Sequence, residues 1–436
     1  MKTSLLIIAT LIALTCGMEE LQFYFPPRLY IYNVLSILFI FNFIICVTLK
    51  PKSFVMNNKE LKYFLYIMWT YFFIQVLSGL KVIFFFNSED SFLQYFKIIL
   101  SNGTFTVFTT FFYVFLSNIG REERYRILLF YIAGVVLSSV YGFLGSFLYI
   151  NYGIRIENYV WNYLSYYPDN SFVERDITWT VLGIRRGYGF PGVNAAATYN
   201  ATILPLLLLF VLYRRSIKDY IIFCICFIGL LVTISRTGFL AFSVSLLIVF
   251  IISFKTIKRP FITLLIIAAP FLLAGYYWWD YIIEITQARP LKDVERLMQW
   301  ESGLFLFSNN FLLGVGANNF SVVRWSLPSY FYHDENLHNS WLTILVELGL
   351  LGLICYLIFL AFIVWRIYKS YDIISRGFLC AIIGLSVAAF SNQLFDIFYF
   401  KFFIILMFSM VAMRDGYVFR SGHNRNANLL TAEGKT

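Results

Sequence analysis

SWLTILVELGLLGLICYLIFLAFIVW, residues 340–365, is the stretch that decides the fold class. Its only charged side chain is Glu347. A helix of roughly 20 apolar residues is long enough to cross the hydrocarbon layer of a membrane. Inside lipid every backbone amide needs a partner within the protein, so a run of this kind must be helical. The sequence therefore predicts a membrane-spanning helix at this position.

Similar apolar segments recur along the whole chain. Of the 436 residues, 60% are hydrophobic and only 13% are charged, and the mean hydropathy of +0.73 excludes a soluble globular domain. The apolar runs predict twelve transmembrane helices, at residues 4–17, 29–49, 61–80, 95–117, 126–150, 194–213, 218–234, 237–254, 260–279, 340–365, 377–391 and 396–413. We therefore expect an all-α, multi-pass protein whose residues 1–436 form a single integral membrane domain.

The basic residues predict how these helices are oriented. Every second connection carries Lys and Arg, as short cytoplasmic loops do. The clusters are Lys50, Lys52, Lys59 and Lys62; Arg121, Arg124 and Arg126; Arg214, Arg215 and Lys218; Lys255, Lys258 and Arg259; and Arg366, Lys369 and Arg376. Lys2 and the basic tail 414–436 fall on the same side, so both termini are predicted to be cytoplasmic. Topology thus explains the net charge of +10, and no nucleic-acid partner is implied.

The first apolar segment is similar to a signal peptide that ends near Cys16, but no small-x-small cleavage site follows it. We interpret it as a retained helix. All six cysteines lie within apolar spans, a distribution that indicates neither a disulfide framework nor a zinc site. We expect them to serve as small packing residues.

The two longest connections, residues 151–193 and 280–339, both fall on the outer side of the predicted topology. The second contains apolar residues at helical spacing over 291–307, directly after Pro290, which suits the first turn of a helix. This pattern predicts an amphipathic helix lying along the membrane surface. Gly314 and Gly316 then allow the chain to make a tight return. We expect the chemistry of the protein on this outer face.

His338, one of only three histidines, lies at the outer membrane boundary just ahead of the run 340–365, where Asn339 or Ser340 can cap the helix. An imidazole titrates near neutral pH, and at this depth it can meet both a lipid-borne donor and a water-borne hydroxyl. His338 is therefore a candidate general base. A hydrogen-bonded interfacial histidine is the alternative interpretation.

Arg236, in ISRTGFLAF, falls in a very short outer connection between two apolar spans. A charged side chain close to the membrane core is costly, so an arginine there is a candidate functional residue. Its planar guanidinium can bind phosphate oxygens through two parallel hydrogen bonds. An arginine that extends to lipid headgroups explains the position equally well.

Glu347 lies within the span 340–365 and needs a buried partner, either an arginine or a polar network. Helix packing alone is again the alternative. His338, Arg236 and Glu347 are the candidate catalytic residues.

Further arginines on the outer face are candidates for binding an anionic group. A solvated loop face accounts for most of them individually. The candidates are Arg185, Arg186, Arg289 and Arg296, with Arg324 as an additional outer cation. His333, Asp334 and Glu335 are interpreted as loop polarity, and no metal site is predicted.

Four pieces of sequence, taken in order, resemble the O-antigen polymerase and ligase superfamily of bacterial polysaccharide assembly. They are SRTG on a short outer turn, an arginine-bearing loop, FLLGVGANNF (311–320) and HNSWLTILVELGLLG (338–352). GYGFPGVNAAATYNA (187–201) is similar to a further pattern of that superfamily. The resemblance covers roughly residues 185–355.

This resemblance implies a metal-independent, cofactor-free glycosyltransferase in the bacterial inner membrane, with its active site on the periplasmic face. The implied donor is a glycan linked to undecaprenyl pyrophosphate, the implied acceptor is a second glycan, and membrane lipid surrounds both. By the same analogy His338 is the base on the acceptor hydroxyl, and Arg236 with Arg289 or Arg296 contacts the donor pyrophosphate. Arginines can stabilise such a leaving group without a metal ion.

Four functions stay open. A polymerase moves the growing glycan onto a lipid-linked repeat unit, with a chain-length regulator as a further candidate partner, and the intact HNSWLTILVELGLLG stretch favours it. A ligase moves the finished glycan onto lipid A core, and transfer to protein hydroxyls is a related possibility. A twelve-span transporter or flippase is the unrelated alternative, but it predicts symmetric halves and charges in mid-span.

Overall fold

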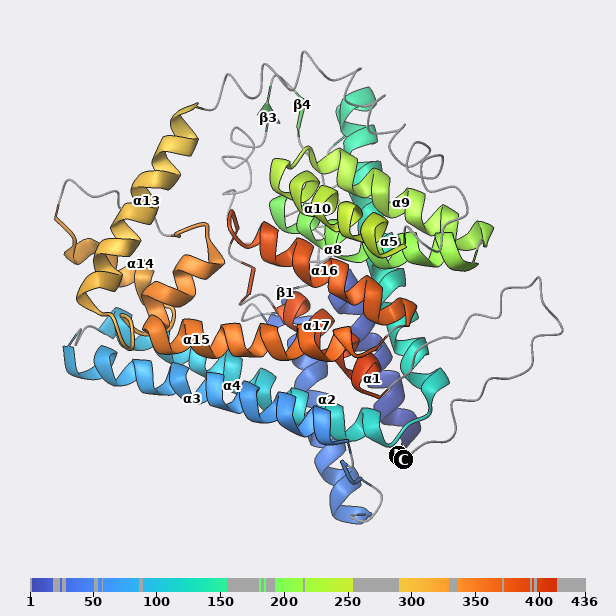
Figure 1. The fold of residues 1–436 in the computed structure, drawn as a ribbon, viewed down its shortest axis with the longest axis horizontal. Helices are drawn as coiled ribbons and strands as arrows, with labels where there is room; N and C mark the ends of the chain where they lie inside the picture. The colour runs from blue at the N-terminus through green and yellow to red at the C-terminus, as the bar shows by residue number, and fades with distance from the viewer. Residues whose placement is uncertain are drawn as a thin grey trace.

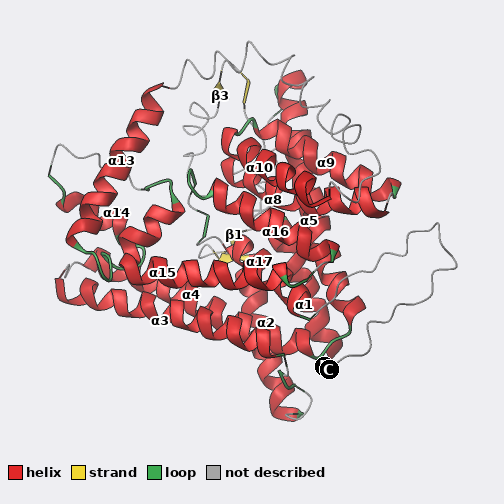
Figure 2. Cartoon of the chain, in the orientation of Figure 1, coloured by secondary structure: helices red, strands yellow, loops and turns green. Residues whose placement is uncertain are grey.

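The computed structural model describes residues 2–18, 24–25, 29–50, 54–56, 58–85, 89–154, 180–181, 184–185, 193–214, 216–253, 290–328, 336–370, 372–392, 394–395 and 398–413. These residues are almost entirely helical (Figure 2). The helices are α1 Lys2–Gly17, α2 Ile31–Leu49, α3 Lys59–Phe85, α4 Glu89–Ser117, α5 Arg121–Tyr152, α8 Val193–Arg214, α9 Ile217–Thr233, α10 Arg236–Ser253, α13 Pro290–Asn309, α14 Phe320–Val323, α15 Ser340–Tyr368, α16 Ile373–Ala388 and α17 Phe398–Ala412.

Two short antiparallel strand pairs lie outside the helices. β1 (Tyr24–Phe25) pairs with β2 (Leu29–Tyr30), and β3 (Thr180–Val181) pairs with β4 (Ile184–Arg185). A short 3₁₀ turn, Arg324–Ser326, follows α14. None of these small elements alters the helical fold class that the sequence predicts.

Eleven of the twelve predicted membrane segments coincide with a helix of the structure, and the remaining one, 260–279, lies outside the described residues. Within the described part of the chain, five helical stretches are long and apolar enough to cross a membrane: Ile31–Leu49, Tyr95–Ser117, Arg121–Tyr149, Ala196–Arg214 and Ser340–Tyr368. By length and composition, these stretches support a multi-pass membrane protein. The predicted count of twelve spans and the orientation of the termini are not tested by the structure.

The helices form two packed groups. α3 lies beside both α4 and α15, and these three run lengthwise through the molecule (Figure 1). α8 packs against α9, α10 and α16, and its residues Leu204–Phe210 are almost wholly buried. α5 runs across the direction of α3 and α15 and packs on α1, where Gly17 and Gly134 bring the two backbones together. α13 and α14 stand at one end of α3 and α15.

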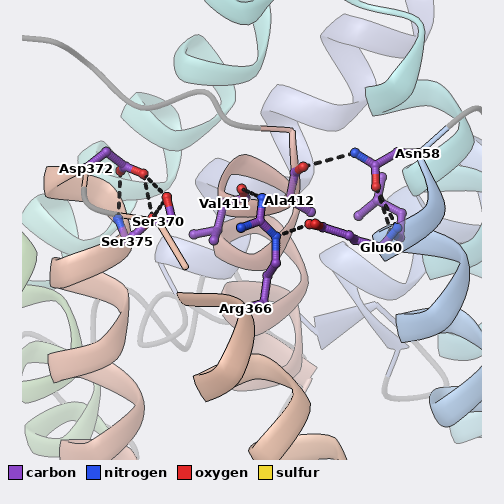
Figure 3. A network of polar contacts seen from close by, with 9 residues as sticks. Asn58, Glu60, Arg366, Ser370, Asp372, Ser375, Val411 and Ala412 are labelled. Atoms are coloured by element: carbon purple, nitrogen blue, oxygen red, sulfur yellow. Dashed lines mark hydrogen bonds and ion pairs between the residues drawn. The ribbon is translucent and has the colours of Figure 1, made fainter. Parts of the chain in front are cut away.

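A polar network closes the far end of α15 (Figure 3). Arg366, only 3% exposed, donates through Nε to the carboxylate of Glu60 and through Nη2 to the carbonyl of Val411 at 3.1 Å. Asn58 Nδ2 donates to the carbonyl of Ala412 at 3.0 Å. The sequence predicts Arg366 in a basic loop, whereas the structure places it in the last turn of α15. There its side chain binds Glu60 of α3 and the carbonyl of Val411 in α17.

Candidate functional site

The start of α15 has the cap that its sequence predicts. The side chain of Asn339 accepts a hydrogen bond from the amide of Leu342 at 3.1 Å, and Asn339 itself has the extended backbone of an N-cap. His338, immediately before it, has φ +48° and is partly buried. This left-handed conformation is uncommon for a residue with a Cβ, although histidine adopts it more readily than most.

Ser340 ties the start of α15 to the turn after α16, which comprises residues 389–392 and 394. Its amide donates to the carbonyl of Ala389 at 2.8 Å, and its hydroxyl donates to the carbonyl of Asn392 at 2.7 Å. The same hydroxyl accepts from the amide of Leu394 at 2.7 Å. The position of His338 is therefore fixed relative to α16 as well as to α15.

The SRTG segment contacts the same turn. Thr237 Oγ1 and Ser391 Oγ share a hydrogen bond of 2.7 Å, and Ser235 Oγ donates to Asn194 Oδ1 at 3.0 Å. Arg236 begins α10, and its side chain is exposed. Two motifs that are distant in sequence thus meet at the turn after α16, and a third, the segment 187–201, contacts the SRTG segment through Asn194.

α13 approaches this region through Trp300, whose indole Nε1 donates to the carbonyl of Leu337 at 3.0 Å. Leu337 directly precedes His338. Arg296 lies four residues before Trp300, so the two side chains share one face of α13, and Arg296 is partly buried. α13 confirms the predicted helix over 291–307, including Pro290 as its first residue. Arg296 thus lies one helical turn before the residue that contacts the backbone next to His338.

Glu347 is 8% exposed, and its partners include two backbone amides of the preceding loop. Oε2 accepts from the amide of Asn318 at 2.8 Å, and Oε1 accepts from the amide of Phe320 at 3.4 Å. The sequence predicts an arginine or a polar network as its partner, and these two amides belong to such a network. They hold the loop GVGANNF (314–320) against α15.

α15 is broken next to Glu347. Gly349 has φ +65° and ψ −165°, values outside the helical region. At this break the carbonyls of Val346 and Glu347 accept from the amides of Val315 and Gly316, at 2.9 and 3.0 Å. In return the amides of Leu350 and Leu351 donate to the carbonyls of Phe311 and Leu312.

These four hydrogen bonds replace the intrahelical ones that the break removes, because residues 350 and 351 would otherwise donate to the carbonyls of residues 346 and 347. Irregular backbone within a membrane protein is tolerated where the protein itself supplies such partners. The predicted tight return at Gly314 and Gly316, which have φ +68° and +102°, is confirmed.

We expect Glu347→Ala to lower the free energy of unfolding by about 3 kcal/mol, because it leaves two buried loop amides without their charged acceptor. Glu347→Gln keeps one acceptor oxygen and should cost less. Thermal unfolding in detergent measures both variants, and limited proteolysis of residues 310–320 reports release of the loop. Equal stability of Glu347→Ala and the unchanged protein would show that the carboxylate does not anchor the loop.

Left-handed backbone gathers in this region. Among the described residues, three non-glycine residues have positive φ: Ile234 at +46°, Asn318 at +57° and His338 at +48°. Ile234 precedes the SRTG segment, Asn318 lies in the loop held by Glu347, and His338 precedes the cap of α15. Such conformations cost free energy and cluster at functional sites, and a β-branched residue such as Ile234 is a clear outlier.

For the remaining predicted site residues, the structure describes only the backbone of Arg185. Arg185 lies in β4, where only its backbone pairing with Thr180 is described. Arg186 and Arg289, and the trio His333, Asp334 and Glu335, lie outside the described residues. Within the residues that are described, no three His, Cys, Asp or Glu side chains are grouped as metal ligands.

Sequence reasoning missed the turn after α16 as the meeting point of the motifs. Residues 389–391 were expected to continue the span 377–391, but α16 ends at Ala388. The polar residues Ser391 and Asn392, set between apolar stretches, are the signal that indicates this end. Trp300 is a second residue that sequence reasoning missed, because its indole nitrogen donates to the backbone before His338 and no local pattern indicates that contact.

Comparison with known protein families adds an independent finding. Residues 221–357 match the family model described as O-antigen ligase. The matched segment contains the SRTG turn, α13, the GVGANNF loop and the first part of α15, whereas the turn after α16 lies beyond it. No curated protein matches the chain. This match supports the resemblance of residues 221–357 to the O-antigen polymerase and ligase superfamily.

Proposed function

We propose that the protein is an O-antigen, or surface polysaccharide, polymerase. It transfers a glycan from an undecaprenyl-pyrophosphate donor to a lipid-linked repeat unit at the periplasmic face of the bacterial inner membrane. The observation that carries the proposal is the hydrogen-bonded meeting of the SRTG turn, the histidine turn and α16, which unites Thr237, Ser340 and Ser391. The family match over residues 221–357 supports the same class of reaction.

In this reaction the acceptor hydroxyl oxygen attacks the anomeric carbon of the donor. A new glycosidic bond forms, and the bond between that carbon and the pyrophosphate oxygen breaks, so the pyrophosphate leaves with the electron pair. His338 takes the proton of the acceptor hydroxyl. Arg236 and Arg296, from α10 and α13, supply positive charge to the departing pyrophosphate, and Arg185, Arg186 and Arg289 are further candidates for this role.

Hydrogen bonds to the residues on either side of His338 hold it in position for proton transfer. His338 is held from both sides, through Leu337 by Trp300 and through Ser340 by the turn after α16. A catalytic group that is held in place before the substrate arrives loses little entropy in the reaction. Glu347 contributes indirectly, because it holds the loop 314–320 against α15.

A ligase is the second candidate, and the description of the matching family as O-antigen ligase favours it. The two reactions share the donor and the leaving group and differ only in the acceptor. The proposed partners, a polyprenyl-linked donor and a glycan acceptor, are therefore common to both. A chain-length regulator is a further proposed partner of the polymerase.

Deletion of the gene in its host distinguishes the two candidates. For a polymerase we expect lipid A core that carries a single repeat unit, with no long chains, and restoration of the long chains by the unchanged gene. Bare core, with long chains accumulating on the polyprenyl carrier, would identify a ligase instead. An unchanged glycan profile would contradict both and favour a transporter.

A further inference from the structure

Asn392 lies in the turn after α16, between the two motifs that the proposed reaction uses. Its carbonyl accepts from the amide of Ser340 at 3.2 Å and from the hydroxyl of Ser340 at 2.7 Å. Ser340 is two residues after His338. The preceding residue, Ser391, shares a hydrogen bond with Thr237 of the SRTG segment. The backbone of Asn392 is therefore held against the histidine turn and, through its neighbour, against the SRTG segment.

The side-chain amide nitrogen of Asn392 is buried and makes no hydrogen bond. The residue is 7% exposed, and its Nδ2 has no acceptor among the residues that the structure describes. Such a donor costs free energy, because it has given up its hydrogen bond to water and received none in return. Most buried polar groups in proteins are hydrogen-bonded, so an exception requires a reason. A substrate oxygen that accepts from Nδ2 supplies one at this position.

The geometry of glycosyl transfer indicates which part of the substrate is near Asn392. In a direct displacement, the attacking oxygen and the leaving oxygen lie on opposite faces of the donor sugar. In the proposed reaction His338 takes the proton at the first oxygen, and Arg236 supplies positive charge near the second. The transferred sugar therefore lies between the histidine turn and the SRTG segment, which are the two elements bonded to the turn that contains Asn392.

We propose that Asn392 binds the donor sugar whose anomeric carbon is attacked. Its Nδ2 donates to an oxygen of that sugar, either a hydroxyl or the carbonyl of an acylamino group, and so helps to determine which sugar is transferred. The last torsion of an asparagine side chain has broad minima, so Nδ2 can turn toward the substrate while the carbonyl keeps its bonds to Ser340. This inference rests on the proposed glycosyl transfer, and it holds for both a polymerase and a ligase because they share the donor.

Asn392→Leu removes the amide and keeps the number of heavy side-chain atoms. We expect kcat/KM for the donor to fall about tenfold, the effect of one hydrogen bond, through a higher donor KM with little change in kcat. The KM of the acceptor should not change. The unfolding temperature should stay the same or rise, because a buried donor without a partner has been removed. Asn392→Ala should have the same effect on the donor KM without the bulk of leucine.

The experiment measures transfer in reconstituted vesicles from the undecaprenyl-pyrophosphate-linked repeat unit purified from the host. It also uses analogues in which one hydroxyl or acylamino group of the pyrophosphate-linked sugar is replaced by hydrogen. For the unchanged protein, one analogue should lose the same factor that Asn392→Leu loses. Asn392→Leu should use that analogue and the complete donor equally well, because the contact is absent in both cases. Asn151→Leu is the matched control, because Asn151 is exposed and its amide already donates to the carbonyl of Phe147 at 2.8 Å.

Other results would overturn the inference while the transfer reaction itself stands. One is a donor KM that both Asn392 variants leave unchanged. Another is a set of analogues that lose as much in Asn392→Leu as in the unchanged protein, because the amide would then contact no oxygen of that sugar. Lower unfolding temperatures in both variants would assign the amide a structural role instead. An unchanged protein that transfers no glycan would contradict the proposed function, and this inference with it.

Discussion

Replacing His338 by asparagine should reduce glycan transfer at least ~100-fold while leaving the amount of folded protein in the membrane unchanged, because a positioned general base contributes a factor of this order. Asparagine has no basic nitrogen, so it cannot take the proton of the acceptor hydroxyl. It does tolerate the left-handed backbone that His338 adopts at φ +48°. The substitution therefore removes the base without straining the turn.

Two further variants complete this experiment. His338→Ala removes the base as well but adds roughly 1 kcal/mol of backbone strain at positive φ, so a lower thermal stability in this variant alone would reveal that strain. Lys369→Met serves as an unrelated surface change. The measurement is transfer from a polyprenyl-pyrophosphate donor in reconstituted vesicles. Undiminished transfer by His338→Asn would remove the base assignment.

Gly349→Ala should prevent the protein from folding, with a loss of roughly 3 kcal/mol or more. Gly349 has φ +65° and ψ −165°, a region that only glycine enters readily. A Cβ at this position would also lie 2.4 Å from the carbonyl carbon and oxygen of Leu312. Neither atom can move away, because the carbonyl of Leu312 accepts from the amide of Leu351.

Gly153→Ala is the matched control for this effect. Gly153 has the same φ of +65°, but nothing lies within 4 Å of the position where its Cβ would be. With ψ 12° it lies in the ordinary left-handed region, so alanine there carries only the milder strain of that region, about 1 kcal/mol, and no steric contact. The yield of monodisperse protein in detergent and its unfolding temperature measure both changes. Equal behaviour of the two variants would show that close contact with the loop does not determine the folding of α15.

The apolar helices were predictable because their signal is local. Twenty apolar residues in succession, as in 340–365, have few alternatives to a helix, and the positions of Pro290 and Asn339 mark the beginnings of α13 and α15. The break at Gly349 was not predicted. A glycine among apolar residues also occurs in continuous membrane helices, and the loop that satisfies the broken backbone lies more than thirty residues earlier in the chain.

The site was predicted in part for the same reason. His338 and Arg236 were identified by their residue type and their place at the ends of spans, which are local features. The role of Ser391 depends on a contact across 154 positions of sequence with Thr237, and no local pattern encodes that distance. For Glu347, the need for a buried partner was evident from its charge, whereas the identity of the partner, the amides of Asn318 and Phe320, required the fold.

The contacts of Ser340 have a consequence for the order in which the protein is made. The loop 311–316 is synthesised before the break at Gly349, so its partner groups are already present when α15 emerges from the ribosome. Ala389, Asn392 and Leu394, which bind Ser340, are synthesised some fifty residues later. A nascent chain that stops before α16 thus has the broken helix in place but leaves the histidine turn without its anchor, so the histidine turn is completed late in synthesis.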